Sequence, residues 1–219
     1  MFDFDASTGE VFLYDDIGPA WLGMIDASTV MNAIKGFDGR LTVRINSPGG
    51  SVDEAIAIYN MLERHKGGVD VAIDSLAASA ASYIAMVGEK ITISSGGAVM
   101  IHHPWTFAVG NAAEMRKTAD TLDKYSARTS SAYARRMKDT TPEDLERMLA
   151  DETWFAAGEA IAAGLADEEG NYYVEPVAVA DGRYMKTPAQ FMAKKEGGER
   201  TQYNRQTASY RAKIAAIGK

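Results

Sequence analysis

Residues 41–62, LTVRINSPGGSVDEAIAIYNML, decide the fold. The first five residues alternate apolar and polar side chains, a period of two that is typical of a half-buried β-strand. Two glycines at 49–50 then allow a tight turn, because glycine adopts backbone conformations that other residues avoid. From Ala55 to Leu62 the apolar residues recur at three- and four-residue spacing, which predicts one buried face of a helix. The stretch therefore predicts a strand, a turn and a helix in direct succession.

The same succession is predicted on both sides of this stretch. Residues 9–15 indicate a first strand, and a helix follows Asp26-Ala-Ser28, whose serine caps its start. Downstream, the pattern predicts a strand at 69–73, a helix at 80–87 closed by Gly88, and two strands at 91–93 and 98–102. Strands that alternate with helices are typical of βαβ units with right-handed crossovers, so we expect an α/β fold.

The second half of the chain begins with a long predicted helix. It runs from Asn111 to about Asp139, and Asn111 and Glu114 have the spacing of a capping box. Another helix is expected to start at Thr141, with proline at its first position. The remaining expected elements are a short apolar segment at 153–155, a small helix at 158–163 that ends at Gly164, and a last strand at 172–179. Beyond residue 181 the hydrophobic periodicity fades, so we place a domain boundary near residue 182.

The composition excludes several classes of protein. The 219 residues include no cysteine, which rules out disulfide scaffolds, thiolate zinc sites and cysteine nucleophiles. No apolar run approaches the roughly 18 residues of a membrane span, so we expect a cytoplasmic protein without a membrane partner. The net charge is −7, and residues 183–219 hold nine Lys or Arg against two Glu, a balance of +7 that leaves −14 on residues 1–182. An acidic domain argues against specific nucleic-acid binding.

Three features indicate a nucleophilic site. The turn at 49–50 can point backbone N–H groups at a negative oxygen. Ser79 stands where a strand leads into a helix, so it can attack a carbonyl while the N–H of Ala80 holds the developing oxyanion. His102 ends a predicted strand, and histidine accepts a proton near neutral pH. Taken singly, the turn and Ser79 also fit an ordinary glycine turn and a helix cap.

A carboxylate that orients the histidine would complete a triad. Asp151 and Glu152 both precede an aromatic segment, and spacing does not choose between them. A histidine metal site is a poor alternative, because His102 and His103 are adjacent and would point apart on a strand, while His65 follows a helix face. We expect no metal and no bound cofactor.

Four motifs resemble those of the Clp-type serine proteases, in family order and with near-gapless spacing. They are INSPGG at 45–50, AAS at 77–79, MIH at 100–102, and GEA at 158–160 followed by GLAD at 164–167. Each motif is weak alone, but together they cover about residues 9–170 and are highly specific. Further stretches resemble the Clp-related head-maturation (prohead) proteases of tailed phages: ASAASYIAM at 78–86, HPW at 103–105, GNA at 110–112 and ETWF at 152–155.

This resemblance implies a role for each matched residue. Ser79 would be the nucleophile and His102 the general base, and the backbone amides of Gly50 and Ala80 would form the oxyanion hole. The third member of the triad departs from the family pattern. The housekeeping enzymes carry Asp where a gapless alignment places Glu152.

We therefore favour Glu152 as the third triad member, with Asp151 as the alternative.

The resemblance also implies the fold, the assembly and the activity. Clp proteases have a crotonase-like ββα superhelix, and the helix at 111–139 would be the handle by which rings of subunits pair. We expect a Clp-like serine protease domain over residues 1–182 and a basic, flexible C-terminal extension over 183–219, as a scaffold-like or self-cleaved tail. The expected function is a serine endopeptidase in a homo-oligomeric ring that processes scaffold and capsid polypeptides inside an assembling procapsid, in the host cytoplasm.

Three alternatives use the same fold. A bacterial Clp peptidase would work with an ATP-dependent unfoldase, but the chain starts almost at its first strand, so we do not expect an unfoldase partner. A crotonase-like enzyme would bind an acyl-CoA thioester, although crotonases usually rely on carboxylates rather than on a Ser-His pair. An inactive structural homologue would keep the fold without the chemistry.

Overall fold

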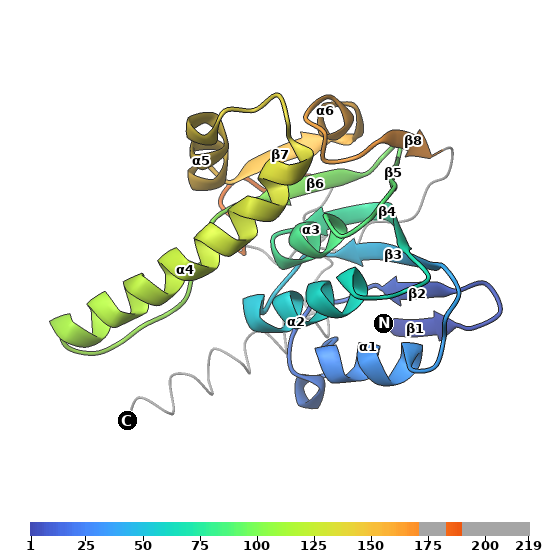
Figure 1. The fold of residues 1–219 in the computed structure, drawn as a ribbon. Helices are drawn as coiled ribbons and strands as arrows, with labels where there is room; N and C mark the ends of the chain where they lie inside the picture. Colours follow the sequence, from blue (N-terminus) through green and yellow to red (C-terminus); the bar gives the residue numbers. More distant parts are fainter. Residues whose placement is uncertain (171–182, 190–219) are drawn as a thin grey trace, which may run out of the picture.

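The computed structural model describes residues 1–170 and 183–189 (Figure 1). The strands are β1 (Phe2–Asp5), β2 (Glu10–Leu13), β3 (Leu41–Ser47), β4 (Val69–Ala78), β5 (Ile91–Ser94), β6 (Ala98–Ile101), β7 (Thr153–Ala156) and β8 (Glu168–Gly170). The helices are η1 (Ala20–Leu22), α1 (Ala27–Ile34), α2 (Val52–Glu63), α3 (Ala80–Ala85), α4 (Ala112–Arg136), α5 (Pro142–Ala150) and α6 (Ala157–Ala162). All eight strands belong to one mixed sheet, and the alternation of strands with helices confirms the predicted α/β class.

Strand β4 is the centre of this sheet because it changes partner along its length. Residues 71–73 pair in parallel with β5, whereas residues 76–78 pair in parallel with β6. The other edge of β4 pairs with β3, and the sheet continues through β2 to β1. Two strands thus end side by side, and the residues that follow them are Ser79 and His102.

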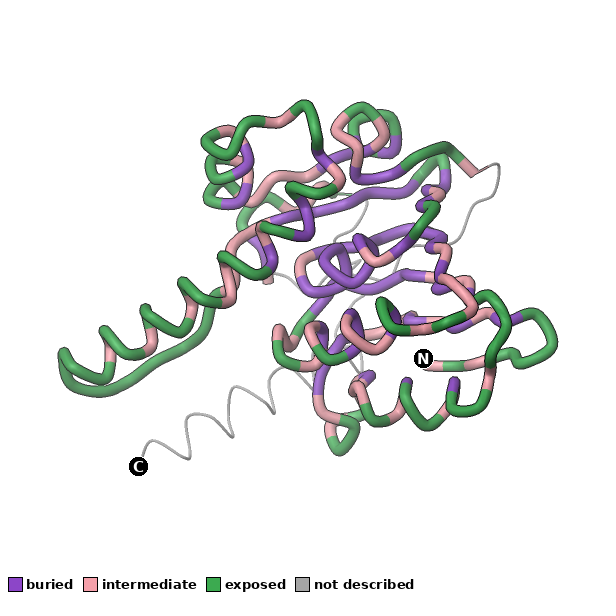
Figure 2. The backbone as a smooth tube through the Cα atoms, viewed as in Figure 1, coloured by how far each residue is buried: buried purple, intermediate pink, exposed green. Residues whose placement is uncertain are grey.

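The larger of two hydrophobic cores among the described residues covers the inner sheet positions and the adjoining helices. Its fully buried side chains include Val11, Val43, Ile45, Ile58, Ile73, Ile84, Ile91 and Ile93. Figure 2 shows the buried backbone concentrated in the central strands and in α3. Burial of these side chains supplies the main driving force for folding, at about 25 cal/mol per Å² of apolar surface.

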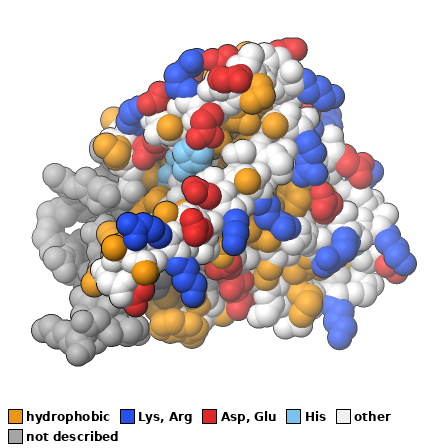
Figure 3. Space-filling model, turned by 60° about the vertical axis from the view of Figure 1, so that its left-hand side comes forward, with side chains coloured by type: hydrophobic (Ala, Val, Ile, Leu, Met, Phe, Trp, Pro, Cys, Tyr) orange, Lys and Arg blue, Asp and Glu red, His pale blue; other side chains and the backbone are white. Residues whose placement is uncertain are grey.

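Helix α4 behaves differently, because most of it projects away from this body (Figures 1 and 2). Its capping box at Asn111 and Glu114 is present as predicted, and only its last turns are buried, at Thr129, Ala132 and Tyr133. On the face from which α4 projects, acidic and basic side chains are interspersed, with hydrophobic patches and a histidine among them (Figure 3). Among the described residues, no helix is long and apolar enough to cross a membrane.

Some elements differ from the sequence predictions. The chain opens with β1, which pairs antiparallel with β2, so the strand expected at 9–15 is the second one. Strand β8 adds a short parallel edge next to β5 that we did not expect. The strand predicted at 172–179 and most of the predicted extension, residues 190–219, lie outside the described residues.

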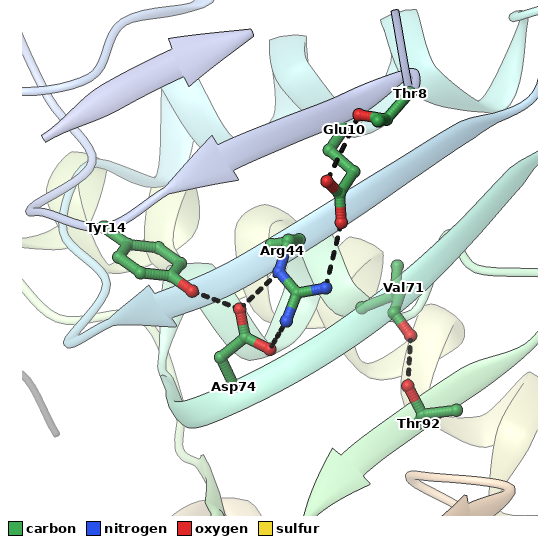
Figure 4. Close-up of polar contacts among 7 residues, drawn as sticks. All are labelled: Thr8, Glu10, Tyr14, Arg44, Val71, Asp74 and Thr92. Carbon is green, nitrogen blue, oxygen red and sulfur yellow. Dashed lines mark hydrogen bonds and ion pairs between the residues drawn. The ribbon is translucent and has the colours of Figure 1, made fainter. Parts of the chain in front are cut away.

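A buried polar network crosses β2, β3 and β4 (Figure 4). The Arg44 guanidinium donates to both carboxylate oxygens of Asp74, at 2.8 and 2.5 Å, and to Glu10 at 3.1 Å. The Tyr14 hydroxyl also donates to Asp74. Burial, followed by the hydrogen bond to Asp74, raises the pKa of Tyr14 to about 12. The Asp74 side chain is fully buried, so its charge depends on these partners.

We predict that Arg44→Met lowers the free energy of unfolding by about 3 kcal/mol or more, because it leaves a buried carboxylate without its cation. Urea unfolding followed by circular dichroism measures the change. Arg40→Met is the matched control, since Arg40 forms exposed ion pairs with Asp70 and Glu89 that solvent screens. Equal losses in the two variants would contradict the assignment of the network as a buried structural element.

Candidate active site

Ser79 occupies a sharp turn between β4 and α3. Its backbone has φ 56° and ψ −122°, a left-handed conformation that is strained for a residue with a side chain. The Ser79 N–H donates to the carbonyl of Met100 at 2.9 Å, and this bond fixes the turn against β6. A serine on such a turn presents its hydroxyl beyond the end of the sheet, as in other nucleophile elbows.

The turn is held from behind by Ser82, which is fully buried. The Ser82 hydroxyl lies 2.7 Å from the carbonyl of Ser79 and 2.8 Å from that of Met100. It also lies 2.8 Å from the hydroxyl of Tyr133, on the buried end of α4. These bonds compensate for the strain at Ser79, since a strained residue persists only where its surroundings fix it.

His102 stands next to Ser79, as the partner change in β4 requires. Its Nε2 lies 2.7 Å from Ser79 Oγ, which is hydrogen-bond distance. Burial lowers the pKa of His102 to about 4, and the charge of Glu152 partly opposes this shift. The imidazole is therefore neutral at pH 7, and a neutral imidazole can accept a proton from the hydroxyl.

The neighbouring His103 points elsewhere. Its Nε2 lies 3.0 Å from the carboxylate of Glu146 on α5. Among the described residues, no group of three or more His, Asp or Glu side chains could hold a metal ion.

The glycine loop after β3 packs directly against the serine turn. Gly49 has φ 85°, and a Cβ on it would lie 2.9 Å from the N of Ala80 and 3.0 Å from the Cβ of Ser79. Gly50 has φ 149°, and a Cβ there would lie 2.0 Å from the carbonyl oxygen of Ile17. Only glycine fits these two positions.

The two amides expected to form an oxyanion hole are those of Gly50 and Ala80. No hydrogen bond between described residues uses either N–H group. Both belong to segments that adjoin Ser79, and backbone N–H groups of this kind stabilise a developing oxyanion when it lies within about 3 Å of them.

Of the two candidate acids, Glu152 carries the charge that partly opposes the decrease in the pKa of His102 caused by burial. Its carboxylate accepts hydrogen bonds from the N–H groups of Met185 at 2.9 Å and Lys186 at 2.7 Å, and from the Trp154 indole at 3.4 Å. No hydrogen bond between described residues joins Glu152 to His102.

Asp151 has a different position. It is the C-terminal cap of α5, its side chain is exposed, and its backbone carbonyl accepts from Lys186 Nζ at 2.5 Å. The structure therefore separates the two acids that sequence spacing left equivalent.

A shallow hollow of about 20 Å³ adjoins the Ser-His pair. Its walls come from the start of α2, from α3 and from the buried end of α4, and small or apolar side chains dominate them. The lining residues are Val52, Ala55, Ser79, Ala80, Tyr83, His102, Pro104, Thr129 and Tyr133. The surface beside Ser79 is therefore mainly apolar.

Sequence reasoning missed the contribution of residues 183–187. Tyr184 is buried and lies edge-on against the rings of His102 and Trp154, with centroid distances of 5.4 and 6.0 Å. Arg183 pairs with Asp16, which is also buried. The only signal in the sequence was the Arg-Tyr pair at 183–184, next to the predicted domain boundary. Because hydrophobic periodicity fades there, the sequence predicted a flexible tail.

Comparisons with known proteins show which family this sequence resembles. The family model described as Clp protease matches residues 7–170, a range that includes Ser79, His102 and Glu152. The chain is 32% identical over 128 residues to the ATP-dependent Clp protease proteolytic subunit 1 of Synechococcus sp. (strain CC9902), covering 56% of this chain and 63% of that protein. It is 29% identical over 130 residues to the proteolytic subunit 3 of Streptomyces coelicolor, covering 58% of this chain and 59% of that protein.

A third relative, the proteolytic subunit 2 of Parasynechococcus marenigrum, is 32% identical over 128 residues, which cover 56% of this chain and 63% of that protein. The chain thus spans about three-fifths of the length of these relatives. Its sheet and helices are consistent with the Clp protease/crotonase-like fold that the motifs implied. The family match over most of its length shows that this chain belongs to the Clp protease family.

Proposed function

We propose that this chain is a serine endopeptidase whose nucleophile is Ser79. The observation that carries the proposal is the 2.7 Å contact between His102 Nε2 and Ser79 Oγ on a strained turn. A nucleophile within hydrogen-bond reach of a base is the signature of an activated serine. The same pair disfavours a crotonase-like enzyme, which would rely on carboxylates.

The chemistry follows from the positions of these groups. His102 Nε2 takes the Ser79 hydroxyl proton as Oγ forms a bond to the peptide carbonyl carbon, and the N–H groups of Gly50 and Ala80 stabilise the negative oxygen. The C–N bond then breaks, and the leaving amine takes the proton from His102. Water repeats the sequence on the acyl-enzyme, so a carboxylic acid is released and Ser79 is restored. These steps need neither a metal nor a cofactor.

The substrate is a polypeptide with an apolar side chain next to the scissile bond. The hollow beside Ser79 supports this part of the proposal, because Val52, Ala55 and Tyr83 give it an apolar lining. Discrimination among apolar side chains is expected to be modest, since one methylene changes binding by only about 1–3 kcal/mol.

The active form is a homo-oligomeric ring, and paired rings are the expected larger assembly. Two features support this proposal: the projecting helix α4, and the exposed apolar side chains of Trp105, Phe107 and Val109 on the loop that precedes it. Exposed apolar clusters of this kind mark interaction surfaces. Enclosure in a ring also restricts access to the active site.

Two biological roles fit such a peptidase. The relatives are named as subunits of ATP-dependent Clp proteases, which favours a bacterial Clp-type peptidase and, with it, an unfoldase partner. Processing of capsid and scaffold proteins in a phage procapsid rests on the motif resemblance alone. Of the two roles, the relatives support the Clp-type peptidase.

The first prediction concerns the nucleophile. A fluorophosphonate probe is expected to form an adduct at Ser79, located by peptide mass spectrometry, because His102 activates this hydroxyl. The Ser79→Ala variant should lose the adduct, whereas Ser131→Ala, which changes an exposed serine on α4, should keep it. An adduct at another serine, or one that survives Ser79→Ala, would contradict the assignment.

The second prediction concerns pH. Labelling requires neutral His102, whose pKa is held at about 4 by burial, so the rate should stay constant from pH 7 to pH 5 and fall by half near pH 4. The second-order labelling rate constant gives the profile, and circular dichroism checks that the fold persists. A half-point near 6.5, the ordinary value for histidine, would show that His102 is not desolvated in this way.

The third prediction separates the two acids. Glu152→Gln should reduce peptide hydrolysis roughly 100-fold or more, since removal of a triad carboxylate has a large effect on the rate. It should also lower the pH of half-maximal labelling, because the Glu152 charge raises the pKa of His102. Asp151→Asn, the adjacent matched control, should change the rate less than about twofold. The reverse order of effects would assign the role to Asp151.

A further inference from the structure

The segment from Arg183 to Thr187 lies across the active site, although it is far from the site in sequence. We propose that this segment is an internal peptide ligand that keeps the catalytic site at rest until a substrate displaces it. The proposal rests on the peptidase function argued above. Three sets of contacts carry it.

The first contact is an ion pair behind the glycine loop. The Arg183 guanidinium pairs with the Asp16 carboxylate and donates to the carbonyl of Gly49 at 3.1 Å. The side chains of Arg183 and Asp16 are only 17% and 7% exposed, so the pair is shielded from solvent. Charged hydrogen bonds in such surroundings are stronger than those at the surface. The segment is thus anchored to the loop that carries the Gly50 amide.

The second contact lies against the histidine. The Tyr184 ring packs against His102 and Trp154, and its hydroxyl donates to the carbonyl of Pro48. Tyr184 therefore lies between the glycine loop and His102, beside the Ser-His pair that a substrate has to reach.

The side chain that the segment brings to the Ser-His pair is a phenol, packed against His102. A phenol has no electrophilic carbon for Ser79 to attack, unlike the peptide carbonyl of a substrate. The contact therefore blocks the site without offering a bond to cleave. This distinguishes an inhibitory segment from a substrate captured before self-cleavage.

The third contact involves the acid. Glu152 accepts the backbone N–H groups of Met185 and Lys186, at 2.9 and 2.7 Å. These bonds occupy the carboxylate that would otherwise be available to orient His102. One short segment thus packs against the histidine and engages the acid of the triad.

The segment has the character of a displaceable ligand. Residues 183–187 belong to no helix or strand, and Met185 between the anchors is 92% exposed. Its anchors are the Arg183 ion pair, single N–H bonds and the Tyr184 side chain, which also packs in a small buried cluster with Leu76, Ala78, Ala98 and Met100. A substrate with a cationic residue followed by an aromatic one would compete directly for the positions of Arg183 and Tyr184.

The test uses the full chain and the variant Tyr184→Ala, with Met185→Ala as the matched control because this exposed neighbour makes no side-chain contact in the site. The readouts are the fluorophosphonate labelling rate at Ser79 and the hydrolysis of a fluorogenic peptide. Tyr184→Ala should raise both rates about tenfold or more, and Met185→Ala should change them less than twofold. A synthetic peptide that copies residues 183–188 should then inhibit Tyr184→Ala, and the same peptide with alanine in place of the tyrosine should not.

The outcomes separate this inference from the proposed function. If Ser79 is labelled at the same rate in wild type and in Tyr184→Ala, the inference is wrong and the peptidase assignment stands. If no folded variant is labelled at Ser79, the peptidase assignment itself fails.

Since Tyr184 is buried, the variant could unfold, and a measurement on the wild-type chain covers this case. Hydrogen exchange at the amides of Met185 and Lys186 should accelerate after the adduct forms at Ser79, because the phosphonyl group takes the place of Tyr184. Unchanged exchange would overturn the inference.

Discussion

The change of partner along β4 is the constraint on which the active site depends. Each edge of a strand pairs with one neighbour at any position, so the pairing of β4 with β5 must end before its pairing with β6 begins. The loop between β5 and β6 makes this exchange, and β6 then ends level with β4. Ser79 and His102, 23 residues apart, are brought together by backbone hydrogen bonds of the sheet. Side-chain hydrogen bonds then orient the two side chains, whose positions the sheet has already determined.

The strained serine turn depends on this arrangement. Its N–H and its carbonyl are both held, the first by Met100 and the second by Ser82. Ser82 connects the turn to Tyr133, and therefore to the end of α4 that is anchored in the core. The helix that projects from the body is thus linked to the nucleophile through one buried hydroxyl. A contact made on α4 by a neighbouring subunit could reach the active site by this short route.

Much of this arrangement could be predicted from the sequence, because it depends on local patterns. The alternation in β3, the glycine turn and the capping box of α4 each lie within a few residues, and strand ends in an α/β sheet gather functional side chains. Strand β1 was missed because FDFD is too short for its period to be distinguished from chance. The acid was left open because Asp151 and Glu152 differ by one position, and the direction of each side chain depends on the left-handed backbone at Glu152.

The contacts of residues 183–187 could not be predicted, for a different reason. They join Arg183 to Asp16 and Tyr184 to Pro48, pairs that are more than 130 residues apart and have no periodic signature. Asp16 also has no motif around it, and burial alone distinguishes it from the acidic residues at the surface. Composition revealed the change of charge in this region but not the place where its first residues bind.

The position of Ser79 at the end of β4 has a further consequence. Strand β4 is almost entirely buried and pairs on both edges. We therefore expect its backbone to unfold only when the whole domain unfolds. Ser79 is therefore attached to the cooperative unit of the fold that has the highest stability against local unfolding. Substitutions in the loops and in residues 183–187 can therefore alter access to the site, whereas the position of Ser79 is fixed by the sheet.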